Sequence, residues 1–287
     1  MFRLYSEHVP LREIDAPLLH ALRVRGVELA VAAFAGQEAE YRALARRAAK
    51  AEVKLVLWPL LSGERGRWPS SSNVGAFRDH VLRFIARIAP GTLLFDLEPP
   101  LAWTRAAVHW RYAPRPRRLD SHAPLAKLLR ERGWHVETVV PPMLVYGERW
   151  ERWLGTPAAS SSCARVEPMI YTSLFEGYSR GLVTRRVARD LLVRITRRSG
   201  GTVALGVVGG GALGDERAYR DVGELRDDVA IARAAGARQL SLYALDGILA
   251  RGDVDAWLDA FTRTTAGDLP PRTRRGALLD FAARLLG

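Results

Sequence analysis

Eight short apolar runs recur along the chain, and most of them are followed by a segment with helical spacing of apolar residues. Short strands that alternate with helices indicate a parallel sheet. Eight such units in a chain of 287 residues fit a closed (β/α)8 barrel better than an open, doubly wound sheet. No GxGxxG motif follows an early strand, which argues against a dinucleotide-binding fold. The predicted strands are residues 2–7, 27–34, 53–60, 91–98, 135–140, 165–173, 202–208 and 239–245.

The segments between these runs complete the predicted fold. One further amphipathic helix is expected over residues 272–286, after the last unit. No Pro-rich or Ser-rich linker divides the chain, so we predict an α/β protein with a single (β/α)8 TIM barrel domain over residues 1–287 and an extra C-terminal helix. The stretch 101–122 is long for a loop in a compact domain, and the sequence leaves its role open. The other predicted helices are residues 11–24, 38–50, 74–89, 123–132, 146–153, 184–198, 225–235 and 254–262.

The fourth run carries two carboxylates near its end. Side chains alternate along a strand, so Asp96 and Glu98 point to one side and Phe95 to the other. The two acids lie about 7 Å apart along the strand, at ~3.3 Å per residue. Burying a carboxylate without a partner is costly, so this pair indicates either a functional site or a wet strand end. We predict that the strand ends at Glu98 and that Phe95 packs under a helix.

The charge balance does not indicate a nucleic-acid partner. The net charge is +12, with 43 Lys and Arg against 31 Asp and Glu. The arginines are spread over many predicted helices, as solvated helix faces require, and no aromatic-basic motif of a known nucleic-acid reader is present. We therefore expect no nucleic-acid partner.

Cysteine content and hydropathy limit the location and the cofactors. The single cysteine, Cys163, excludes an internal disulfide and a cysteine-based zinc site. The first residues lack the apolar run of a signal peptide, and no stretch is long enough to cross a membrane. We expect a cytoplasmic protein, as the chain is given, with no membrane partner, no cofactor and no metal. The sequence leaves the oligomeric state open.

Acidic and aromatic residues gather where the predicted strands end. The chemistry of a (β/α)8 barrel lies at the carboxyl ends of its strands. Flat aromatic rings cover the apolar face of a sugar, while carboxylates bind hydroxyls and transfer protons. We therefore predict a carbohydrate substrate, with Trp58, Tyr171 and Tyr243 lining the mouth near Glu98. The predicted substrate-binding residues are Trp58, Tyr243, Glu7, Tyr5, Glu167 and Met169.

Three of these strands resemble those of family 18 glycoside hydrolases, the chitinase type. The strand LLFDLE is similar to the Asp-x-Glu ending of the family's signature strand, Pro168-Met-Ile-Tyr171 resembles its Met-x-Tyr, and residues 240–247 resemble its last strand. The resemblance implies that Glu98 is the general acid. It further implies that Asp96 orients the substrate acetamido group, whose oxygen attacks the anomeric carbon, and that Tyr171 hydrogen-bonds that group.

The chain also departs from the family pattern. The full signature has two further aspartates, where this chain has Gly91 and Leu94, and Asp often follows the Tyr, where this chain has Thr172. The acid pair also resembles that of family 25 lysozymes, which is our second choice of family.

The resemblance implies an enzyme, a glycosidase that acts on an N-acetylhexosamine-containing glycan. Three other functions remain open on the sequence. A carbohydrate-binding barrel without catalysis would keep the pocket and lose turnover, and the missing aspartates favour it. A barrel enzyme acting on a phosphorylated metabolite would use the run Gly209-Gly210-Gly211 after strand seven, although a tight turn is the simpler explanation of this run. A metal-dependent isomerase would need His8, Glu98 and Glu167 as ligands, although their spacing matches no metal motif.

Overall fold

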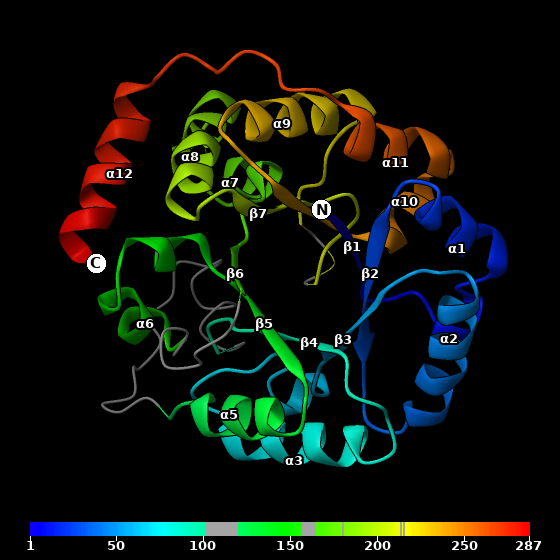
Figure 1. The fold of residues 1–287 in the computed structure, drawn as a ribbon. Helices are drawn as coiled ribbons and strands as arrows, with labels where there is room; N and C mark the ends of the chain where they lie inside the picture. The colour runs from blue at the N-terminus through cyan, green and yellow to red at the C-terminus, as the bar shows by residue number, and fades with distance from the viewer. Residues whose placement is uncertain (101–119, 157–164, 180, 213, 215) are drawn as a thin grey trace.

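Eight parallel strands form a nearly closed barrel in the computed structural model, which describes residues 1–100, 120–156, 165–179, 181–212, 214 and 216–287 (Figure 1). The strand order is β6-β5-β4-β3-β2-β1-β8-β7. A single bridge between Met169 and Ala204 joins the two outer strands of this order. The predicted (β/α)8 fold is confirmed. The strands are β1 (Phe2–Ser6), β2 (Val27–Ala33), β3 (Leu55–Pro59), β4 (Thr92–Asp96), β5 (His135–Val140), β6 (Arg165–Pro168), β7 (Thr202–Gly206) and β8 (Gln239–Tyr243).

Helices surround the strands, and α12 follows the last unit as predicted (Figure 1). None of the helices in the described parts of the chain is long and apolar enough to cross a membrane. The predicted stretch 101–122 lies largely outside the described residues. The helices are α1 (Ala16–Arg23), α2 (Glu38–Lys50), α3 (Val74–Ile85), α5 (Ala123–Glu131), α6 (Arg149–Leu154), α7 (Thr172–Tyr178), α8 (Arg185–Arg198), α9 (Val222–Ala234), α10 (Leu245–Arg251), α11 (Val254–Arg263) and α12 (Arg274–Leu286), with the 3-10 helices η1 (Leu11–Glu13), η2 (Gly63–Arg65) and η3 (Pro142–Tyr146).

Several predicted boundaries were wrong. The predicted helix 11–24 is divided into η1 and α1, because the Asp15 side chain caps α1 by accepting a hydrogen bond from the Leu18 N–H. The sixth run was predicted as a strand to residue 173, but the backbone turns into α7 at Thr172. The eighth run likewise turns into α10 at Leu245. Apolar residues in these short helices made them indistinguishable from strand ends in the sequence.

The predicted alternation along β4 is confirmed. Phe95 packs against Phe77 of α3, with ring centroids 5.3 Å apart, whereas Asp96 lines the barrel mouth. The predicted end of the strand at Glu98 was wrong, because β4 ends at Asp96. The Leu97 N–H still donates to the Val139 carbonyl of β5, but the Glu98 N–H donates to the Pro69 carbonyl in the loop after β3. Glu98 thus leaves the sheet while it stays at the mouth.

A buried ion network fills the amino end of the barrel. Arg3 is fully buried and donates to Glu137 at 2.6 Å and to Glu28 at 2.9 Å. Lys54 binds the second oxygen of Glu28 at 2.7 Å. These contacts close the end of the barrel that lies opposite the mouth, where apolar packing alone would not satisfy the charges.

We expect Arg3→Met to lower the free energy of unfolding by about 3–5 kcal/mol, because it removes the fully buried guanidinium that binds both Glu28 and Glu137. Urea unfolding measures this change. The matched control is Arg23→Met, whose ion pair with Glu52 is exposed and contributes at most about 1 kcal/mol. Equal losses for the two variants would contradict a structural role for the buried network.

Candidate active site

A cavity of about 210 Å³ opens at the carboxyl ends of the strands. Its walls are aromatic and its polar groups are mainly carboxylates. All three residues predicted to line the mouth near Glu98 lie in its wall: Trp58, Tyr171 and Tyr243. The four carboxylates that line it are Glu7, Asp96, Glu98 and Glu216.

The aromatic walls are fixed by contacts between the rings. Tyr171 stacks on Tyr243, with centroids 5.7 Å apart and ring planes inclined by 10°. Tyr5 meets Trp58 edge-on at 5.3 Å, and Trp58 meets Tyr243 edge-on at 6.4 Å. Edge-on and stacked rings stabilise one another by about 0.5–1.5 kcal/mol per pair beyond their burial. The cavity therefore offers a preformed apolar surface to a flat ligand.

Asp96 lies deeper in the barrel than Glu98, the other predicted catalytic acid. It is buried, and its Oδ1 has no hydrogen-bond partner among the described residues. Burial raises the pKa of Asp96 well above its ordinary value, and the Glu7 carboxylate raises it further, while Arg67 opposes both. The Trp58 indole also opposes the rise in pKa, although no hydrogen bond of normal geometry joins its N–H to a described residue. Asp96 can therefore keep its proton and donate it, or orient a ligand amide.

Glu98 stands at the mouth and keeps part of its surface exposed. Enclosure by the protein raises the pKa of Glu98 well above its ordinary value, and the charges of Asp96, Glu216 and Glu7 raise it further. A carboxyl group that stays protonated near neutral pH is suited to donate a proton to a leaving group.

Glu7 is held by Tyr243 and Arg67 at the rim of the cavity. The Tyr243 hydroxyl donates to its Oε2, while the Arg67 guanidinium binds its Oε1 at 2.9 Å from Nε and 2.6 Å from Nη2. This pairing leaves Glu7 fewer free positions for a ligand than Asp96 has. Arg67 is a cation of the site that the sequence did not indicate.

Glu167 does not reach the cavity. Its side chain is buried in the layer below and accepts hydrogen bonds from the Tyr5 hydroxyl at 3.0 Å, from Ser241 at 2.7 Å and from Arg165 at 3.1 Å. Tyr5 and Met169, by contrast, line the cavity. The position of Glu167 separates it from His8 and Glu98, and the described residues contain no cluster of His, Cys, Asp and Glu that could hold a metal ion.

Glu216 is a carboxylate of the cavity that sequence reasoning missed. It follows the glycine run 209–211, and its carboxylate lies over Gly211, where a Cβ would overlap Oε2. Gly211 has φ of +67°, which an L-residue with a side chain rarely adopts. The turn therefore brings a carboxylate to the cavity. A phosphate at the same turn would meet that negative charge.

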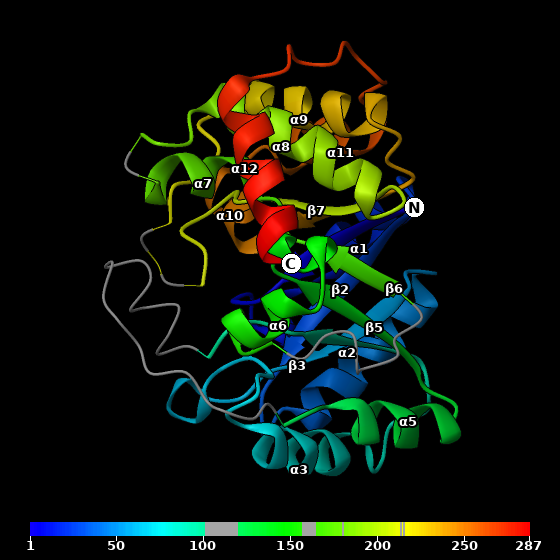
Figure 2. The same ribbon diagram turned by 90° about the vertical axis from the view of Figure 1, so that its left-hand side faces the viewer.

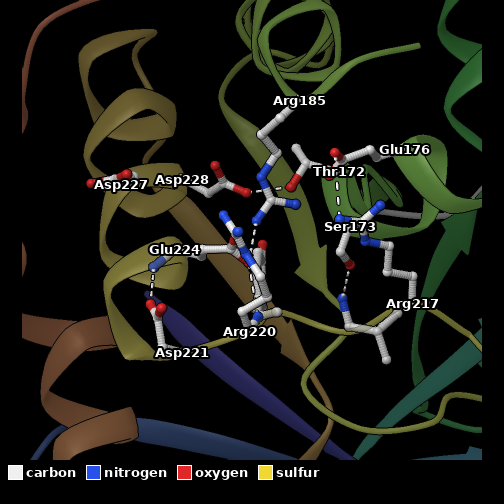
Figure 3. Close-up of polar contacts among 12 residues, drawn as sticks. Thr172, Ser173, Glu176, Arg185, Arg217, Arg220, Asp221, Glu224, Asp227 and Asp228 are labelled. Carbon is white, nitrogen blue, oxygen red and sulfur yellow. Dashed lines mark hydrogen bonds and ion pairs between the residues drawn. The ribbon is translucent and has the colours of Figure 1, made fainter. Parts of the chain in front are cut away.

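The segment after Tyr171 is anchored behind the wall (Figure 3). The Thr172 hydroxyl donates to Asp228 of α9, and the Ser173 hydroxyl donates to the Gly206 carbonyl at 3.2 Å and accepts from the Val207 N–H at 3.0 Å. Thr172 is fully buried and bound to α9, so its side chain points away from the cavity. These bonds tie the Tyr171 backbone to β7 and α9.

Comparisons with known proteins show the fold. No protein-family model and no curated protein sequence matches the chain. Among solved structures, the PgaB glycoside hydrolase domain from Bordetella bronchiseptica is similar with a TM-score of 0.57 and 14% identity, over 93% of this chain and 99% of that one. A glycoside hydrolase family 18 chitinase from Pseudoalteromonas aurantia has a TM-score of 0.53 and 11% identity, over 92% and 99%. Active domain 2 of the Pyrococcus furiosus chitinase has a TM-score of 0.50 and 13% identity, over 98% and 95%.

We expect Glu98→Gln to raise the melting temperature at pH 7 to 8. The raised pKa in the folded state means that an ionised Glu98 destabilises the folded chain relative to the unfolded one. Below about pH 4, the ordinary pKa of Glu, both states hold the proton, so the gain should vanish there and grow as the pH rises.

Thermal melts of both proteins between pH 4 and pH 8 measure this difference. The control is Glu40→Gln, a change at an exposed position of α2, which should move the stability by no more than about 0.5 kcal/mol. A Glu98→Gln variant that is less stable than wild type at pH 8 would show that the carboxylate is stabilised in the folded state.

Proposed function

We propose that the chain is a glycoside-hydrolase-like protein that acts on an N-acetylhexosamine-containing glycan. The observation that carries this proposal is the placement of Asp96 and Glu98 in one cavity walled by Trp58, Tyr171 and Tyr243. The raised pKa of both acids supports proton donation. The barrels that the chain resembles include a glycoside hydrolase domain and chitinases. The proposed reaction, hydrolysis of a glycosidic bond, belongs to the same class.

Glu98 is the general acid in this proposal. It transfers its proton to the glycosidic oxygen as the bond to the anomeric carbon breaks. The substrate's own acetamido oxygen forms the new bond to that carbon, so no enzyme nucleophile is needed. Glu98 then takes a proton from the water that opens the cyclic intermediate, which restores the acid for the next turnover.

Asp96 and Tyr171 hold the acetamido group. Asp96 lies deeper than Glu98 and has an oxygen without a partner among the described residues, so it can bind the amide nitrogen. Burial raises the pKa of the Tyr171 hydroxyl well above its ordinary value, so it stays protonated and can donate to the substrate. The stacked pair of Tyr171 and Tyr243 supplies an apolar wall for the sugar ring.

A carbohydrate-binding barrel without turnover is the second candidate function. Leu94 lies in the barrel interior on the same side of β4 as Asp96, where the family signature has a further aspartate. A leucine cannot hydrogen-bond Asp96, and the Oδ1 of Asp96 has no partner among the described residues. The same cavity would then bind the sugar while the acid pair lacks the support that turnover needs.

We expect Glu98→Gln to lower turnover at least ~100-fold, the lower end of a general-acid contribution. Gln keeps the shape of the side chain and removes the proton. Asp96→Asn should also slow turnover, and Glu167→Gln should slow it less because Glu167 does not line the cavity. The assay uses an N-acetylglucosaminide with a poor leaving group, since an activated one departs without the acid.

The Glu40→Gln variant is the control for this assay and should keep wild-type turnover. Wild-type turnover with an unaffected Glu98→Gln variant would rule out the assignment of the acid. If wild type binds chitin or peptidoglycan fragments but turns over none of them, the binding barrel is the correct function.

We expect Asp96→Asn to move the basic limb of the kcat/KM profile to lower pH. The charge of Asp96 raises the pKa of Glu98, so its removal lowers that pKa, and the general acid loses its proton at lower pH. The profile between pH 4 and pH 9 measures the shift. A basic limb that stays in place would contradict the coupling between the two acids.

A further inference from the structure

The C-terminal helix α12 is docked by its polar side. Tyr146 donates from its hydroxyl to Asp280 at 2.9 Å, and Trp150 donates from its indole nitrogen to the Ala283 carbonyl at 2.8 Å. Gly276 and Asp280 are the buried residues of the helix, four positions and about one turn apart. Polar contacts and a glycine therefore hold α12 on the barrel, and its leucines are exposed.

The opposite side of α12 is apolar and faces solvent. Leu278, Phe281 and Leu285 recur at the spacing of one helix face, and their exposed fractions are 66%, 58% and 63%. Leu279 and Leu286 flank them and are also exposed. We name these five residues the outer stripe. Figure 1 shows α12 at the outer rim of the molecule, and Figure 2 shows it lying beside α8.

Arginines lie at the start of α12 and in the groove beside it. Arg274 and Arg275 begin the helix, and both are exposed. Asp280 is the only acid of α12 and is buried on the other side, where Arg284 binds it at 2.5 Å. The surface next to the stripe therefore carries positive charge and no exposed carboxylate on α12. Further exposed arginines nearby in the structure line the groove between α8 and α12, namely Arg197, Arg198 and Arg272.

We propose that the outer stripe and its arginines bind α12 to an anionic lipid surface. An amphipathic helix with an apolar face and flanking basic residues lies in the interface of a bilayer, held by buried apolar area and by attraction to anionic headgroups. The sequence-based expectation of no membrane partner rested on the lack of a spanning segment, which a helix lying on the surface does not require.

A second copy of the chain fits this surface less well. A helix of 13 residues is about 20 Å long at ~1.5 Å per residue. With a width of about 10 Å, its outer face covers roughly 200 Å², far below the ~800 Å² per partner of a stable interface. Two such faces would also bring their arginines together. A lipid surface has no such area requirement, and its negative charge complements the arginines.

Vesicle co-sedimentation of the full chain tests the proposal. The probes are vesicles of phosphatidylcholine with 30% phosphatidylglycerol and vesicles of phosphatidylcholine alone. Wild type should bind the anionic vesicles at least ten-fold more strongly, and added salt should weaken the binding. The double variant Leu278→Ser, Leu285→Ser should lose at least ten-fold in partitioning. Arg274→Ser should lose roughly five-fold, from about 1 kcal/mol for each basic residue.

The matched control replaces two exposed leucines elsewhere, Leu182→Ser and Leu249→Ser, and should bind like wild type. All variants should keep the wild-type melting temperature, because the changed side chains point to solvent. Wild type that does not bind anionic vesicles would overturn the proposal. So would self-association of wild type, seen by analytical ultracentrifugation, that the Leu278→Ser, Leu285→Ser variant abolishes, since the stripe would then be a dimer interface.

Discussion

Alternation of side chains along closed parallel strands is the constraint on which the rest of this structure depends. Once β4 joins β3 and β5, every second residue must point into the barrel. Phe95 then lies against α3, and Asp96 points to the mouth. A shift of one residue would exchange these faces and bury the carboxylate among helix contacts. The position of the proposed acid pair therefore follows from the same pairing that builds the barrel.

The interior is polar at both ends for different reasons. At the amino end, Arg3 binds Glu28 and Glu137, so each buried charge has a partner of opposite sign. At the mouth, four carboxylates line the cavity and Arg67 binds one of them, Glu7, while burial raises the pKa of Asp96 and Glu98. The first arrangement satisfies its charges and holds the fold. The second leaves proton-holding acids beside open space, which costs stability and is typical of functional sites.

The wall of the cavity depends on residues that never reach a ligand. Thr172 and Ser173 turn away from the mouth and bind Asp228 and Gly206, and Tyr171 next to them faces the cavity.

The outer surface of α12 has a different origin. Its polar contacts face the barrel, which leaves an apolar stripe that the fold does not use. The proposal for the cavity and the proposal for α12 use different residues, so each stands on its own evidence.

The sequence by itself indicated the barrel, the faces of β4 and the aromatic and acidic residues at the strand ends. Side-chain alternation and the succession of strands and helices along the chain can be read from local patterns. Only the tertiary structure decided which distant side chains meet. Glu216 reaches the cavity from a loop, Arg67 binds the cavity residue Glu7 from another loop, and Glu167 is satisfied by Tyr5 and Ser241 in the layer below. The tertiary structure also decided the orientation of α12. An amphipathic pattern predicts that its leucines are buried. The barrel surface under the helix instead presents a Tyr hydroxyl and arginines, so Asp280 faces inward and binds them.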